Sequence, residues 1–210
     1  MKRVYVVGDS ISIQYGPYLG RYLAGVMAYA RKEGEEEARL NLDRPQGANG
    51  GDSSMVLAFL RACQKTGGLE ADVLLLNCGL HDIKTDPATG LRQVPLAEYR
   101  ANLQQIVALV RRMGVELVWV RTTPCDEAVH NRPGMAFHRF AADAEAYNAA
   151  ADEIMAAAGV ETIDLHTFTR NLGPDLYVDH VHFHEHVREK QAAYLAGWLA
   201  YWRRRHGEER

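Results

Sequence analysis

Val4-Tyr5-Val6-Val7-Gly8-Asp9-Ser10 is the stretch that decides how this chain folds. Its first four residues are β-branched or aromatic, which indicates a buried strand. A glycine then ends the strand, and a serine follows just past the break. Ligands bind at the carboxyl ends of strands in open parallel sheets, so Ser10 is well placed to act as a nucleophile. A turn or a helix cap uses the same residue types, and the role of Ser10 therefore depends on what the rest of the chain supplies.

Strand-like and helix-like segments alternate along the whole chain. Each crossover is long enough for a parallel connection, which favours an α/β fold with helices on both faces of the sheet. We therefore expect a single domain over residues 1–210, built as a three-layer α/β/α sandwich with a central parallel sheet of about five strands. The predicted strands cover residues 4–7, 39–42 (the weakest), 72–77, 116–121 and 160–165. The predicted helices cover residues 17–27, a segment capped by Ser53 or Ser54, and residues 96–113, 137–158 and 184–204.

The composition is that of an ordinary soluble globular protein. With 210 residues, 47% of them hydrophobic and 24% charged, the chain can bury a sizeable core. A net charge of -3 gives no electrostatic reason to bind nucleic acid or an anionic membrane. The apolar runs are too short to span a bilayer or to form a signal peptide. Three cysteines in no metal-binding spacing fit reduced thiols in the cytoplasm.

A base and an orienting acid stand together near the carboxyl end of the chain, in Asp179-His180-Val181-His182. An aspartate three residues before a histidine can lie on the same side of a turn. The carboxylate of Asp179 would then hold the Nδ1–H of His182 and leave Nε2 free to take a proton from Ser10. A polar loop before a helix is the alternative interpretation of this stretch.

Two further stretches follow predicted strands and should meet Ser10 at the same edge of the sheet. In Gly50-Gly51-Asp52-Ser53-Ser54, a glycine can point its backbone N–H at a ligand. In Gly79-Leu80-His81-Asp82, the side chain of His81 would project over the same edge. A flexible turn with a helix cap is the alternative for the first stretch, and a turn with an Asx-type aspartate is the alternative for the second.

Together, the four stretches resemble the GDSL-type, or SGNH, hydrolase family, and the resemblance covers nearly the whole chain. The family's blocks carry a catalytic serine, an oxyanion glycine, an oxyanion asparagine and an Asp-x-x-His pair. The resemblance implies a flavodoxin-like sheet and a serine esterase that forms a covalent acyl-enzyme without a cofactor. It assigns Ser10, His182 and Asp179 as the triad, and the Ser10 and Gly51 amides as oxyanion donors. Asp9, Asp82 and Asp164 are expected to brace the loops of the site.

His81 departs from the family pattern, which has asparagine at this position. A neutral histidine can also donate one N–H to an oxyanion. We therefore expect His81 to take the role of the family's asparagine.

The two long loops after the predicted strands at 72–77 and 116–121 should shape the substrate pocket. Their side chains are polar and mostly basic, which favours a short acyl group, such as acetyl, on a polar alcohol such as a carbohydrate. A lipase, a thioesterase or an acyltransferase with the same triad is the alternative. The basic residues of these loops are Lys84, Arg92, His130, Arg132, His138 and Arg139.

Two interpretations of other kinds remain open at the level of sequence. His180, His182, His184 and His186 alternate and could bind a metal, although a helix starting near His184 would point their side chains in different directions. A non-catalytic α/β module could instead bind a phosphorylated small molecule at its helix N-termini. Neither glycine-rich phosphate-binding motif is present. We expect a small-molecule ester as the partner, whereas the sequence does not indicate an oligomeric state.

Overall fold

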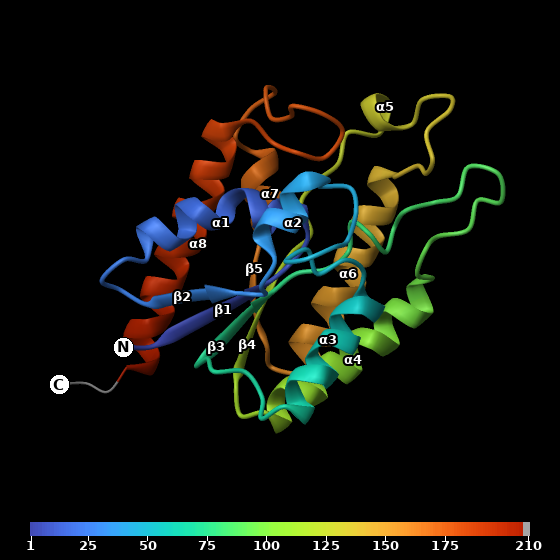
Figure 1. The fold of residues 1–210 in the computed structure, drawn as a ribbon. Helices are drawn as coiled ribbons and strands as arrows, with labels where there is room; N and C mark the ends of the chain where they lie inside the picture. The colour runs from blue at the N-terminus through green and yellow to red at the C-terminus, as the bar shows by residue number, and fades with distance from the viewer. Residues whose placement is uncertain (208–210) are drawn as a thin grey trace.

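The computed structural model describes residues 1–207, so residues 208–210 of the expected domain lie outside the described part. Five parallel strands form one sheet in the order β2-β1-β3-β4-β5 (Figure 1). This is the flavodoxin-like order, with its switch point at β1 and β3. The predicted fold class is confirmed. The strands are β1 (Arg3–Val7), β2 (Ala28–Arg31), β3 (Val73–Leu76), β4 (Glu116–Val120) and β5 (Glu161–Ile163).

Helices cover both faces of the sheet, as Figure 1 shows. One layer consists of α1 (Ser10–Tyr22) and α8 (Glu185–His206), which pack against each other. The opposite layer consists of α3 (Ser53–Lys65), α4 (Leu96–Arg112) and α6 (Ala141–Ala157). The short helices are α2 (Glu35–Leu40), α5 (Glu127–His130) and α7 (Leu165–Arg170). Each short helix follows a strand, so all three lie beyond the carboxyl edge of the sheet. No helix within residues 1–207 is long and apolar enough to cross a membrane.

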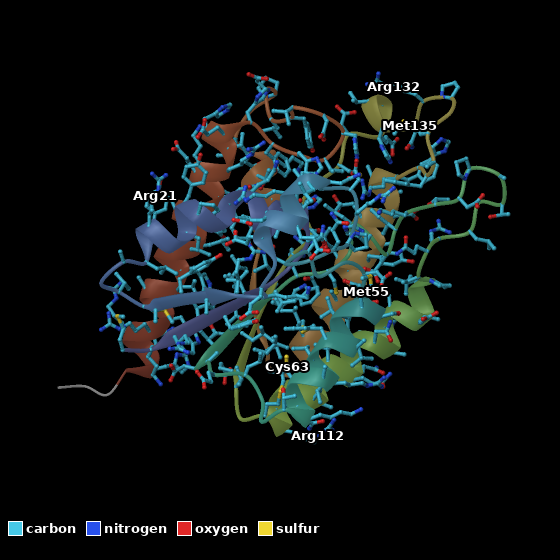
Figure 2. The ribbon with its side chains drawn as sticks, viewed as in Figure 1. Arg21, Met55, Cys63, Arg112, Arg132 and Met135 are labelled. Carbon is cyan, nitrogen blue, oxygen red and sulfur yellow. The ribbon has the colours of Figure 1, made fainter. Side chains whose placement is uncertain are left out.

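The carboxyl edge of the sheet is also where the long loops gather. Figure 2 places Arg132 and Met135, in the loop after α5, at the end of the molecule opposite Arg112 and Cys63. All four residues of β3 are buried, as a central strand covered on both faces must be. The loop before α3 also lies at this edge, because the N–H of Gly50 donates to the carbonyl of Gly8 at 2.8 Å. Loops from distant parts of the sequence are thereby tied to the end of β1.

The first helix begins earlier than predicted. Residues 17–27 were expected to be helical with Pro17 at the start, whereas α1 begins at Ser10 and contains Pro17 in its interior. Pro17 has no N–H to donate to the carbonyl of Ile13. The guanidinium of Arg39 donates to that carbonyl instead, at 3.2 Å. The helix therefore tolerates its proline because α2 supplies the missing donor.

The prediction of a strand at residues 39–42 is wrong. Leu40 ends α2, and the edge strand is β2, formed by residues 28–31. Asp52, rather than Ser53 or Ser54, caps α3 by accepting from the N–H of Met55 at 2.9 Å. The last strand, β5, is shorter than predicted, since α7 takes up residues 165–170. The helix before that strand, α6, starts at residue 141 rather than at residue 137.

Candidate functional site

Ser10 lies at the carboxyl end of β1 as the first residue of α1, and it is 3% exposed. Asp9 caps the helix, because its Oδ1 accepts from the N–H of Ile11 at 3.0 Å. The first four N–H groups of a helix have no acceptor within it, so the amide of Ser10 points out at the positive end of the helix dipole. The cap thus fixes both the Ser10 hydroxyl and a free backbone donor at the same point.

His182 connects Ser10 to Asp179 through two hydrogen bonds. The Nε2 atom of His182 lies 2.9 Å from the Oγ of Ser10, and its Nδ1 lies 2.6 Å from the Oδ2 of Asp179. The histidine is 3% exposed, so its ring has little freedom to turn away. The residues come from opposite ends of the chain, and the packing of α1 against α8 brings them together.

Asp179 holds the turn that carries His182 as well as its imidazole ring. The Oδ1 atom of Asp179 accepts from the N–H groups of Val181 and His182 at 2.9 and 2.8 Å. Burial alone would raise the pKa of Asp179. The hydrogen bonds from the His182 side chain and from the two amides outweigh burial and hold that pKa well below its usual range. Asp179 is therefore ionised and can stabilise a proton on His182.

Gly51 lies directly before the cap of α3, with a φ of 71° that favours glycine. A Cβ at this position would stand 2.6 Å from the sulfur of Met55. The N–H of Gly51 donates to the Oδ1 of Asn49 at 3.0 Å. To donate to an oxyanion, the Gly51 amide must either form a bifurcated hydrogen bond that keeps Asn49 as one acceptor or give up its hydrogen bond to Asn49.

His81 is 1% exposed in the loop after β3, and its Nδ1 is buried without a hydrogen-bond partner. Burial, together with the charges of Lys84 and Arg139, lowers the pKa of His81 well below its usual value. The ring is therefore neutral and carries one N–H. Two residues earlier, Gly79 packs closely against Thr122, just past β4. A Cβ at Gly79 would lie 2.2 Å from the Oγ1 of Thr122.

Asp82 ties the His81 loop to the Gly51 loop. Its carboxyl oxygens accept from the N–H of Ser53 at 2.9 and 3.1 Å. Burial raises the pKa of Asp82 to about 8, although the hydrogen bonds from Ser53 oppose this shift. The two loops that carry the expected oxyanion donors are thus held at a fixed separation. Asp164 lies elsewhere, where it caps α7 and pairs with Arg121 at 2.9 Å.

Several polar residues that support this site could not be identified from the sequence. Asn49 accepts from Gly51, and Gln93 donates to Asp52 at 2.6 Å. Asn131 bonds both the N–H and the carbonyl of Arg139, at 2.9 and 2.8 Å. Their partners belong to other loops, so no local pattern distinguishes these residues from ordinary loop residues. An Asn-Gly turn at residues 49–50 is the one local signal.

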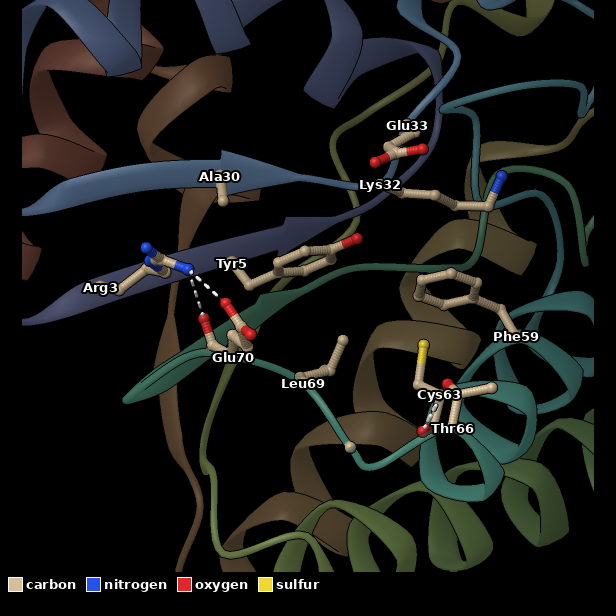
Figure 3. Close-up of a pocket in the computed structure, with 11 residues that line it drawn as sticks. Arg3, Tyr5, Ala30, Lys32, Glu33, Phe59, Cys63, Thr66, Leu69 and Glu70 are labelled. Carbon is tan, nitrogen blue, oxygen red and sulfur yellow. Dashed lines mark hydrogen bonds and ion pairs between the residues drawn. The ribbon is translucent and has the colours of Figure 1, made fainter.

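Two other features of the described chain do not belong to this constellation. A cavity of about 620 Å³ lies beside β1 and β2, where Tyr5, Phe59 and Cys63 face it (Figure 3). None of the residues that line it comes from the four sequence blocks. Within residues 1–207, no group of three or more His, Cys, Asp or Glu side chains could hold a metal ion.

Comparison with known proteins identifies the family. The model of the GDSL-like Lipase/Acylhydrolase family matches residues 6–187. The chain belongs to this family. As a GDSL-family protein it is a carboxylic ester hydrolase, as the resemblance of the four blocks implied. No curated protein sequence matches the chain.

Solved structures share the fold of this GDSL-family chain at low sequence identity. A lipase/acylhydrolase from Enterococcus faecalis is 17% identical, with a TM-score of 0.70 over 96% of this chain and 97% of that one. The acetyl xylan esterase AlAXEase is 14% identical, with a TM-score of 0.67 over 94% and 98%. Est24, a carbohydrate acetylesterase from Sinorhizobium meliloti, is 13% identical, with a TM-score of 0.62 over 96% and 100%.

Replacing Asp179 by asparagine should inactivate the site without unfolding it. The side-chain oxygen of Asn can still accept from the amides of Val181 and His182. Its nitrogen would face Nδ1 of His182 and place the imidazole proton on Nε2, where it blocks proton uptake from Ser10. We expect kcat for a short 4-nitrophenyl ester to fall by about 10⁴-fold, with the thermal unfolding midpoint little changed.

The matched control is Asp175→Asn, in the same loop, where the exposed carboxylate pairs with His184 at 3.3 Å. This variant should retain full activity. An Asp179→Asn enzyme with a rate within tenfold of the wild type would contradict the role assigned to Asp179.

Proposed function

We propose that this protein is a serine esterase that hydrolyses short acyl esters of polar alcohols through a Ser-His-Asp triad. The observation that carries the proposal is the unbroken chain of hydrogen bonds from Ser10 through His182 to Asp179. A serine hydroxyl within hydrogen-bond reach of a base, with the base oriented by an acid, is the arrangement that nucleophilic catalysis requires.

In the first half of the reaction, the Oγ of Ser10 attacks the ester carbonyl while Nε2 of His182 takes its proton. Asp179 stabilises the imidazolium ion that results. His182 then gives the proton to the leaving alcohol as the carbon–oxygen bond of the ester breaks. In the second half, His182 removes a proton from water, the water oxygen attacks the acyl-enzyme, and Ser10 recovers its proton as the acid leaves.

Negative charge develops on the carbonyl oxygen in both halves, and three donors are proposed to receive it. These are the amide of Ser10, the amide of Gly51 and the side chain of His81. The Ser10 amide is favoured by its place at the start of α1. The His81 ring is favoured by its neutral state and by a buried nitrogen without a partner. Gly51 would have to loosen its bond to Asn49 as the oxyanion forms.

The preference for a short acyl group on a polar alcohol rests on the side chains around the site. The loops beside Ser10 carry Lys84, His130 and Arg139, the last two of which are buried. A groove for a long alkyl chain would need apolar side chains in these places. The fold is shared with an acetyl xylan esterase and a carbohydrate acetylesterase, and acetylated carbohydrates therefore form the first class of substrates to test.

We also propose a cytoplasmic location and a role without nucleic-acid or membrane partners. The three cysteines, Cys63, Cys78 and Cys125, are free thiols. Free thiols fit a reducing compartment.

A panel of esters tests the proposed activity and the acyl preference together. It should contain 4-nitrophenyl acetate, butyrate, octanoate and palmitate, with acetylated xylose and glucose alongside. We expect the highest kcat/KM for acetyl esters, a steep fall at octanoate, and release of acetate from the sugars. Ser10→Ala should reduce every rate to the enzyme-free background, because the nucleophile is lost.

Full activity of Ser10→Ala would refute the triad. Faster hydrolysis of palmitate than of acetate would replace the short-acyl proposal with a lipase. If a second alcohol in the assay captured the acyl group more rapidly than water, the protein would be an acyltransferase.

The role of His81 is tested by two substitutions. His81→Ala removes the donor and should lower kcat by about 10²–10³-fold. His81→Asn supplies a side-chain N–H at nearly the same place and should retain much of the activity. Equal losses in both variants, or no loss in His81→Ala, would show that the His81 ring does not stabilise the oxyanion.

A further inference from the structure

Two basic residues stand opposite each other in a backbone pairing close to His81 in the sequence. The backbone groups of Thr85 and His138 exchange two hydrogen bonds, each of 2.8 Å, and form an antiparallel bridge. In this register Lys84 stands opposite Arg139. Side chains that stand opposite each other across an antiparallel pair have Cβ atoms about 5 Å apart, and like charges in such a pair destabilise it. Burial, together with the charge of Arg139, lowers the pKa of Lys84 to about 8.

The Arg139 side chain is fixed in place and has a hydrogen-bond donor without an acceptor. It is 2% exposed, and its Nε donates to the carbonyl of Leu80 at 2.8 Å. This contact places the guanidinium next to His81. Its Nη1 is buried and has no hydrogen-bond partner. Asn131 bonds the Arg139 backbone on both sides, so the position is built into the fold.

Neither cation is neutralised by an ion pair. Within residues 1–207, no carboxylate lies within 4.0 Å of the charged groups of Lys84 or Arg139. Lys84 donates to the backbone carbonyl of Asp43 at 3.0 Å, while the Asp43 carboxylate faces His180 at 3.4 Å. Arg139 is thus a buried charge without an ion pair, which is costly, and buried charges in native proteins are normally paired.

The surroundings of the two cations suit a ligand rather than free solvent. The ring of Phe137 packs against both, with its centroid 4.5 Å from the Lys84 nitrogen and 4.8 Å from the Arg139 guanidinium. The planar guanidinium can bind a carboxylate or a phosphate through two parallel hydrogen bonds. Arg139 donates to the carbonyl of Leu80, the residue before His81, so its guanidinium lies at the loop that carries the proposed oxyanion donor.

From this arrangement we infer that Lys84 and Arg139 bind an anionic group on the substrate, so that the preferred ester carries a carboxylate or a phosphate within a few atoms of its scissile carbonyl. This inference rests on the proposed esterase function and names the substrate class that the same site would select. The anion can lie on the acyl side or on the alcohol side of the ester, and matched pairs of substrates distinguish the two.

The test compares esters that differ by one charge. On the acyl side the pair is mono-4-nitrophenyl succinate and its methyl ester. On the alcohol side the pair is 3-acetoxybenzoate and methyl 3-acetoxybenzoate. We expect kcat/KM of the wild type to favour the anion by at least about tenfold in one of the two pairs, as charge-assisted hydrogen bonds in a buried site do. The favoured pair shows which side of the ester faces the cations.

Three variants assign that preference to the two residues. Lys84→Met keeps the aliphatic stem against Phe137 but removes the charge, and Arg139→Met does the same for the guanidinium. Both should bring the ratio of anionic to neutral kcat/KM towards one, while the neutral ester is still hydrolysed. Arg139→Lys should retain part of the preference. Lys65→Met, an equal change in charge at the exposed far end of α3, should leave the ratio unchanged.

The ratio is measured within each variant, so a general loss of stability or activity cancels. If Arg139→Met fails to fold, Lys84→Met alone still decides the matter. A wild-type ratio near one in both pairs would overturn the inference but leave the esterase proposal intact. The inference would also be overturned if Lys84→Met and Arg139→Met each lowered kcat/KM equally for charged and neutral esters. That outcome would show that the two residues only support the loops. Failure to hydrolyse any of the four esters would instead count against the proposed function.

Discussion

Parallel pairing of the strands is the constraint on which the rest of the structure depends. Because β1, β3 and β4 run in one direction, their carboxyl ends meet at one edge and every return connection must pass over a face of the sheet. Gly8 and Gly79 stand just past β1 and β3 at this edge. Ser10 and the His81 loop are therefore brought to the same edge by the sheet itself.

Short carboxylates then fix the segments that leave this edge. Asp9, Asp52 and Asp164 each accept from an N–H two or three residues on, and each starts a helix. Asp179 accepts from amides at the same spacing and also binds His182. Hydrogen bonds from backbone amides to aspartates thus position the hydroxyl of Ser10, the loop of Gly51 and the ring of His182. Each carboxylate supplies an acceptor to N–H groups that have none in the helix or turn itself.

The sequence predicted the fold class and the four blocks because both rest on local patterns. Buried strands such as 72–77 show as apolar runs, and Ser10, Gly51, His81 and the Asp179–His182 pair follow strands or precede a helix. The start of α1 could not be predicted, since Pro17 is tolerated only through Arg39, a residue far along the chain. The edge strand β2 was missed because residues 28–31 carry Ala and Arg rather than a β-branched run. The opposition of Lys84 and Arg139 depends on a bridge between two loops, which no local pattern shows.

The protonation states of His81 and Asp179 decide which charges the site can stabilise. Burial and two nearby cations keep His81 neutral, and hydrogen bonds keep Asp179 ionised. A neutral His81 and an ionised Asp179 at the Nδ1 of His182 are thus set before any substrate binds. In the mechanism that we propose, a transition state with an oxyanion and an imidazolium fits this distribution better than the neutral ground state does.

The most direct test of the central claim is covalent labelling of Ser10 by a short 4-nitrophenyl alkylphosphonate, followed by intact-mass measurement and peptide mapping. The phosphorus centre mimics the ester carbonyl under attack, so only a serine activated by its base should react. We expect one phosphonyl group per chain, located on Ser10, with loss of esterase activity in proportion to labelling and much slower labelling in Asp179→Asn. An active enzyme that stays unlabelled, or that carries the phosphonyl group on another residue, would contradict the account.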